Sequence, residues 1–118
     1  MLLGIKYIIF FLGYIGKEKG YKNKEEAAKA LAKHFDVILM YCFEKKGVLM
    51  SETDDESVIP EIKPDLFQKY VKNGIISGGM IPKLENAFDA INAGVKEVVI
   101  TRADLIHTNG GTKILGNS

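Results

Sequence analysis

Three segments rich in apolar residues predict β-strands. Residues 5–12 (IKYIIFFL) and 36–43 (DVILMYCF) are rich in β-branched and aromatic side chains and too short for well-defined helices. Such runs are typical of strands buried on both faces of a parallel or central sheet. A third run at 95–100 (VKEVVI) also predicts a strand.

Helical periodicity predicts three helices between these strands. The segment 23–35 begins with an asparagine suited to an N-cap, has acidic residues in its first turn, and has an alanine-rich body. Residues 65–73 follow a proline and carry apolar side chains at helical spacing. The clearest helix has Pro82 in its first turn and ends at Gly94, with an apolar stripe made of Leu84, Ala87, Phe88 and Ile91.

The order strand, helix, strand, helix, helix, strand predicts an α/β fold, a three-layer sandwich around a mostly parallel sheet. The chain has 118 residues and shows no internal repeat, low-complexity tract or linker. A chain of this length forms one core, so we expect a single domain spanning residues 1–118.

Composition narrows the class of protein. Hydrophobic residues make up 47% of the chain and charged residues 26%, which is typical of a globular protein. The net charge of +1 does not favour nucleic acid or an anionic membrane surface as a partner. The single cysteine, Cys42, cannot form an internal disulfide, which favours a reducing, cytoplasmic location. His34 and His107 lack the spacing of metal ligands, so no metal site is predicted.

The apolar N-terminal segment, residues 1–16, allows two interpretations. It is shorter than the roughly 20 residues that a membrane-spanning helix needs, and Lys6 interrupts it. No cleavage pattern of small residues follows it. A buried strand is therefore the preferred interpretation, and a targeting segment or membrane anchor is the alternative.

Candidate chemistry gathers at the predicted carboxyl ends of the strands, where open α/β sheets bind ligands. A charged turn follows the strand 36–43, and Gly78 and Gly79 precede a helix N-terminus, where free amides attract anions. Lys83 lies in the first turn of that helix, where a cation opposes the helix dipole. A bound phosphate would account for this arrangement. An ordinary loop would also account for it, because the stretch lacks the P-loop and dinucleotide fingerprints.

The acidic run 54–56 is a second candidate site. It could suggest a cation site, but it lacks the spacing of a calcium-binding loop. We therefore interpret it as a solvated loop.

Four sequence blocks carry a resemblance to a known family. The segment 74–100 (GIISGGMIPKLENAFDAINAGVKEVVI) resembles the part of acetylglutamate kinases built around a Gly-Met-Ile-Pro-Lys core, within the amino-acid kinase superfamily. The blocks at 41–49 and 54–62 are similar to the Bacteroidetes variant, and 110–114 (GGTKI) resembles the family's terminal Gly-Thr motif. The blocks keep their order from about Gly4 to Ile114, and the match corresponds to the nucleotide-binding half of the kinase.

The resemblance implies transfer of the γ-phosphoryl group of ATP, with Mg²⁺, to the side-chain carboxylate of N-acetyl- or N-succinyl-L-glutamate in arginine biosynthesis. It implies catalytic roles for Lys83, which would contact the phosphates, and for Glu25, which would order the catalytic lysines. Asn23 would hold the acylated substrate. The nucleotide would be bordered by Glu44, Lys45, Lys46, Gly47, Val48, Leu49, Ile75, Ile76 and Ser77.

The chain departs from the family pattern in two ways. In the stretch 21–25 (YKNKE), Tyr21 replaces an asparagine and Glu25 replaces an aspartate. The family's N-terminal half, with its second phosphate-binding lysine, has no counterpart, which predicts an open sheet edge at 5–12. We therefore expect a homo-oligomer or a chain that supplies the missing half. The alternative is a non-catalytic module that keeps the fold and binds a nucleotide or a protein.

Overall fold

The computed structural model describes residues 7–12, 29, 32–33, 36–106, 108 and 110–116. These residues form five strands, two α-helices and one short 3₁₀ helix. In chain order the elements are β1 (Tyr7–Leu12), β2 (Asp36–Phe43), β3 (Glu61–Ile62), α2 (Pro64–Lys72), α3 (Met80–Asn92), β4 (Glu97–Arg102), η1 (Ala103–Leu105) and β5 (Thr112–Ile114).

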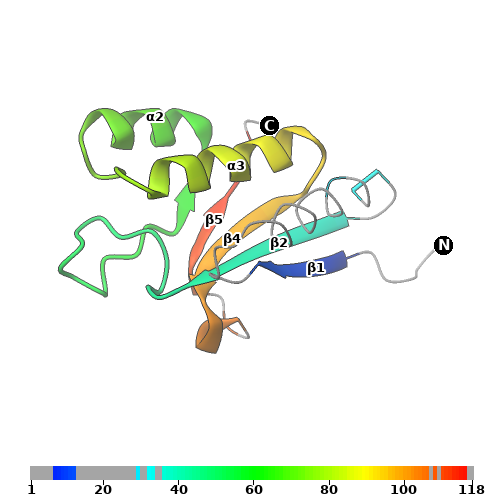
Figure 1. Cartoon of the computed structure of the whole chain (residues 1–118), viewed down its shortest axis with the longest axis horizontal. Helices are drawn as coiled ribbons and strands as arrows, with labels where there is room; N and C mark the ends of the chain where they lie inside the picture. Colours follow the sequence, from blue (N-terminus) through cyan, green and yellow to red (C-terminus); the bar gives the residue numbers. More distant parts are fainter. Residues whose placement is uncertain are drawn as a thin grey trace.

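The strands form one mixed sheet in the order β1-β2-β4-β5-β3 (Figure 1). The pairs β1–β2, β2–β4 and β3–β5 are parallel, and β4–β5 is antiparallel. The predicted mostly parallel sheet is therefore confirmed. Among the described strands β1 pairs with β2 alone, so the expected edge position of segment 5–12 is confirmed as well.

Strand β2 has the bounds that its apolar run predicted. Side chains of Val37, Leu39 and Tyr41 are buried and belong to the main core, because alternate residues of a strand point to the same face. Cys42 points to the other face and is half-buried. Burial raises the pKa of its thiol.

Helices α2 and α3 both cover the core face of the sheet (Figure 1). Phe67 of α2 meets Phe88 of α3 with ring centroids 5.3 Å apart. The predicted stripe of α3 is confirmed, since Leu84 and Ala87 are fully buried and Phe88 and Ile91 are half-buried and pack against the core. Ala90, which the prediction omitted, is also fully buried. Its small side chain lets the helix lie close to the sheet.

The third predicted strand begins two residues later than expected and ends two residues later, at Glu97–Arg102. The Val95 amide still donates to the Ala90 carbonyl at 3.0 Å, so Val95 belongs to the end of α3. Gly94 has φ +117°, a backbone conformation that favours glycine, and it lets the chain turn away from the end of α3. The chain therefore needs two more residues before it can join the sheet.

Two short strands, β3 and β5, were not predicted, and one predicted helix is not described as an element. Most of segment 23–35, and with it that helix, lies outside the described residues. Within the described ranges both α-helices lie on one face, so the third layer of the sandwich stays a prediction. In those same ranges no helix has the length and hydrophobicity needed to cross a membrane.

Candidate functional site

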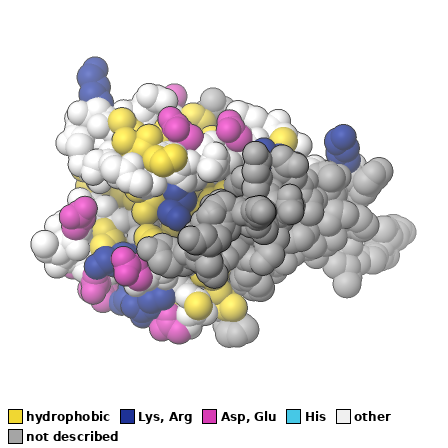
Figure 2. Space-filling model, in the orientation of Figure 1, with side chains coloured by type: hydrophobic (Ala, Val, Ile, Leu, Met, Phe, Trp, Pro, Cys, Tyr) yellow, Lys and Arg dark blue, Asp and Glu magenta, His cyan; other side chains and the backbone are white. Residues whose placement is uncertain are grey.

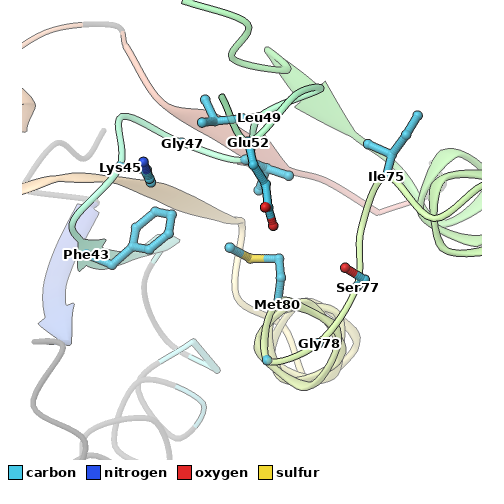
Figure 3. Close-up of a pocket in the computed structure, with 11 residues that line it drawn as sticks. Phe43, Lys45, Gly47, Leu49, Glu52, Ile75, Ser77, Gly78 and Met80 are labelled. Atoms are coloured by element: carbon cyan, nitrogen blue, oxygen red, sulfur yellow. The ribbon is translucent and has the colours of Figure 1, made fainter. Parts of the chain in front are cut away.

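A pocket of about 510 Å³ opens where β2 ends and α3 begins (Figure 3). Its volume is in the range of small-molecule binding sites, about 300–1,000 Å³. Its walls come from the turn after β2, from the loop 51–57, called the acidic loop below, and from the segment that leads into α3. The lining residues are Phe43, Lys45, Gly47, Val48, Leu49, Glu52, Ile75, Ser77, Gly78, Gly79 and Met80.

Six of the nine residues expected to border a nucleotide line this pocket. Glu44, Lys46 and Ile76 are not among the lining residues, and Ile76 is only 1% exposed because it packs in the core. Sequence reasoning missed Phe43 and Glu52. The position of Phe43 at the carboxyl end of a predicted strand was a usable signal, whereas Glu52, just before the acidic run 54–56, had no signal that distinguished it from those residues.

Gly47 lets the turn after β2 lie directly against β5. A Cβ atom at this position would be 2.8 Å from Thr112 Oγ1 and 2.9 Å from Val58 Cγ1. The buried Thr112 hydroxyl accepts a hydrogen bond from the Val48 amide at 2.9 Å and donates one to the Ile59 carbonyl at 2.6 Å. Through these hydrogen bonds Thr112 of β5 holds the turn after β2, one wall of the pocket, against the sheet.

Replacing Thr112 by valine is expected to lower the free energy of unfolding by about 1–3 kcal/mol, because the buried Val48 amide loses its partner. Equilibrium denaturation measures the change. Thr101→Val is the matched control, since Thr101 is also fully buried and its hydroxyl has no hydrogen-bond partner in the described part of the chain. Equal effects of both substitutions would show that the hydrogen bonds of Thr112 contribute nothing.

Carboxylates of the acidic loop form ion pairs with the two lysines of the turn after β2. Lys46 Nζ lies 2.7 Å from Glu56 Oε2, and Lys45 Nζ lies 3.6 Å from Asp55 Oδ1. Asp54 Oδ1 accepts a hydrogen bond from the Glu56 amide. Figure 2 shows acidic and basic side chains intermingled over this part of the surface, where the loop lies in the same orientation in Figure 1.

The acidic run is exposed, as expected of a solvated loop. The described residues contain no group of three or more His, Cys, Asp or Glu side chains that could hold a metal ion.

Lys83 directs its ammonium group over two aromatic rings at the carboxyl end of β2. Its Nζ lies 5.7 Å from the ring centroid of Phe43 and 6.0 Å from that of Tyr41, within the range of cation–π attraction. Burial lowers the pKa of the ammonium group. Arg102 at the same sheet edge is paired with Asp104, whereas Lys83 has no carboxylate partner within the described ranges. Lys83 itself is not among the lining residues of the pocket, but it contacts Phe43, which is.

The N-terminus of α3 offers fewer free amides than the sequence suggested. The Met80 amide donates to the Ser77 carbonyl and the Ile81 amide to the Gly78 carbonyl, both at 3.2 Å. Pro82 has no amide hydrogen. Positive charge at this site therefore comes mainly from the Lys83 side chain, with the helix dipole as a smaller contribution.

Gly78 and Gly79 form the turn before α3. Gly78 has φ +58°, which favours glycine, and a Cβ at either position would have no neighbour within 4 Å. Open space above this backbone leaves room for a ligand. Asn23 and Glu25, the other predicted site residues, lie outside the described residues.

A comparison with known protein families identifies the family of this chain. The model of the amino acid kinase family matches residues 2–102. The chain belongs to the amino acid kinase family. This membership confirms the family resemblance drawn from the sequence blocks and agrees with the α/β architecture.

Within the amino acid kinase family the chain is similar to curated acetylglutamate kinases. It is 68% identical to the Parabacteroides distasonis enzyme over 89 residues, which cover 75% of this chain and 35% of the relative. It is 49% identical to the Cytophaga hutchinsonii enzyme over 98 residues, covering 78% and 37%. The chain therefore spans about a third of the length of these relatives.

Solved structures of similar fold agree with the family assignment. A Streptococcus mutans protein matches with a TM-score of 0.57 and 30% identity, covering 79% of this chain and 35% of its own. A Giardia carbamate kinase matches with a TM-score of 0.54 and 25% identity, covering 80% and 35%.

Proposed function

We propose that this chain is the nucleotide-binding part of an acetylglutamate-kinase-type phosphotransferase and that the pocket at the end of β2 binds ATP. The observation that carries the proposal is the position of Lys83. Its ammonium group lies against Phe43, a wall of the pocket, and has no carboxylate partner among the described residues. A cation beside a wall residue of a pocket, with no carboxylate partner among the described residues, is suited to an anionic ligand such as a phosphate chain.

The walls of the pocket suit a nucleoside with a phosphate tail. The side chains of Val48, Leu49, Ile75 and Met80 offer an apolar surface for a base. The phosphates would extend past Gly78 and Gly79 toward Lys83. Mg²⁺ would be bound mainly through the phosphate oxygens, as is common in sites with few protein ligands.

Lys83 would act by electrostatic stabilisation. In phosphoryl transfer, positioning of the reactants and stabilisation of charge on the transferring group supply most of the catalysis. Burial against Tyr41 and Phe43 limits the directions in which the ammonium group can move. An ammonium group held in this way needs little reorganisation when charge develops on the phosphoryl group.

The acceptor in this proposal is the side-chain carboxylate of N-acetyl- or N-succinyl-L-glutamate, as a step of arginine biosynthesis in the cytoplasm. Family resemblance assigns Asn23 to substrate binding and Glu25 to ordering the catalytic lysines. Further parts of the site would come from a second chain or a second copy. Strand β1, at the edge of the described sheet, offers unpaired backbone groups for such an association.

Calorimetric titration of MgADP into the purified chain tests the nucleotide site. We expect saturable binding with a stoichiometry of one nucleotide per chain, because the phosphates gain an unpaired cation and the base gains an apolar wall. Circular dichroism checks that the chain is folded. A folded chain that gives no heat with millimolar MgADP would refute the nucleotide-binding proposal.

A non-catalytic nucleotide-binding module is the second candidate, and Tyr21 in place of the family's asparagine favours it. Trapping of acyl phosphate with hydroxylamine separates the two candidates. The assay uses MgATP with N-acetylglutamate, N-succinylglutamate or glutamate as acceptor. Product with an acylated acceptor supports the kinase, and MgADP binding without product from any acceptor supports the module.

A further inference from the structure

Glu52 differs from the other acidic residues of its loop. Asp55 and Glu56 pair with lysines, and Asp54 accepts a backbone hydrogen bond. The Glu52 carboxylate makes no hydrogen bond or ion pair with any residue that the structure describes, and it lines the pocket. Figure 3 shows its side chain extending from the loop into the pocket toward Met80.

A free carboxylate in a pocket restricts the ligand group that can lie beside it. An ionised carboxylate only accepts hydrogen bonds, so its partner must be a donor. It repels phosphate, so the part of a ligand beside Glu52 must be a neutral donor rather than the phosphate chain.

We infer that the Glu52 carboxylate accepts hydrogen bonds from the ribose hydroxyls of the bound nucleotide, which makes this a site for ribonucleotides. The inference rests on the nucleotide-binding function proposed above. A carboxylate with two acceptor oxygens matches the two adjacent hydroxyls of ribose. A carboxylate at a nucleotide site recognises ribose in the same way in dinucleotide-binding folds.

Exposure favours the ribose over the base as the partner of Glu52. Glu52 is an exposed residue, whereas Val48, another lining residue, is only 3% exposed. An apolar base gains most from the buried wall, and a sugar keeps contact with water at the rim. A carboxylate at the rim also retains part of its hydration, so it carries a small desolvation penalty.

Titration calorimetry with three magnesium nucleotides tests this inference on the 118-residue chain. We expect 2′-deoxyADP to bind about tenfold more weakly than ADP, because one charge-assisted hydrogen bond is lost. Inosine diphosphate, which lacks the exocyclic amine of adenine, should keep its ribose contact. In the Glu52→Ala variant the preference for ADP over 2′-deoxyADP should fall to less than about twofold.

Glu56→Ala is the matched control, because it removes the same charge from the same loop at a residue that does not line the pocket. This variant should keep the tenfold preference for ADP. Equal affinities for ADP and 2′-deoxyADP in the unmodified chain would overturn the role of Glu52 while leaving the nucleotide site intact. A Glu52-dependent loss with inosine diphosphate alone would also overturn it, since the carboxylate would then contact the base. Absence of ADP binding would overturn both proposals.

Discussion

Replacing Lys83 by glutamate is expected to weaken MgADP binding by about a hundredfold, or about 2.8 kcal/mol. The substitution removes a cation that faces the proposed phosphate position and introduces an anion in its place. Hydrogen bonds to charged groups contribute about 1.5–3 kcal/mol, and like-charge repulsion adds to that loss. Calorimetric titration of both proteins under the same ionic strength measures the difference.

Two further variants separate charge from packing at this position. Lys83→Met keeps an unbranched stem over Tyr41 and Phe43 but has no charge, so it should weaken binding by about tenfold. Lys83→Arg keeps the charge and should bind within a few-fold of the original protein. If the glutamate and methionine variants both bind MgADP normally, Lys83 does not contact phosphate.

The pKa of Lys83 gives this site a distinctive response to pH. Burial lowers the pKa from the ordinary value of 10.5, so the ammonium group deprotonates at a lower pH than an exposed lysine. Affinity for MgADP should therefore fall as pH rises, starting at a lower pH than an exposed lysine would give, while the Lys83→Arg variant should hold its affinity. Folding responds with the opposite sign, because the charged form is the one that burial penalises. Stability contributed by this group rises as pH passes from the folded pKa toward 10.5.

Replacing Gly111 by alanine is expected to lower the free energy of unfolding by about 2–5 kcal/mol. Gly111 has φ +91°, a backbone conformation that residues other than glycine rarely adopt. A Cβ would also lie 2.8 Å from the Ile100 carbonyl oxygen and 2.9 Å from Thr101 Cβ. Neither group is the end of a flexible side chain, so the sheet itself must move. Urea denaturation of both proteins measures the loss.

Gly74→Ala separates the two causes. Gly74 has φ +79°, but a Cβ there would have no neighbour within 4 Å, so only the conformational penalty of about 1–2 kcal/mol applies. The extra loss at Gly111 measures the steric conflict with β4. A Gly111→Ala protein no less stable than Gly74→Ala would mean that the β4–β5 pair relaxes without cost.

Local sequence patterns predicted the parts of the fold that depend on local physics. After Asp36 the run 36–43 is apolar, a charged turn follows it, and the strand has those bounds. Helix α3 shows its stripe and its glycine stop in the sequence. Strands β3 and β5 have two and three residues, too few to produce a period, and they form because distant segments pair with them.

The candidate site also has parts that local sequence patterns predicted and parts that they did not. Its turn, its glycine pair and Lys83 were recognisable because each has a local signature. The importance of Thr112 was not, because it depends on contacts with Val48 and Ile59, more than 50 positions away in the chain. Glu52 looked like its acidic neighbours, and only the path of the loop distinguishes it from them.

The place of β5 in the sheet has a consequence for folding kinetics. β5 is the last strand along the described chain, yet it lies inside the sheet between β4 and β3. Strand β3, made about 50 residues earlier, has no partner among the described strands until β5 arrives. Pairing of β3 with β5 therefore requires closure of a long loop, which slows folding. The pocket wall fastened by Thr112 should be among the last parts of the molecule to become ordered.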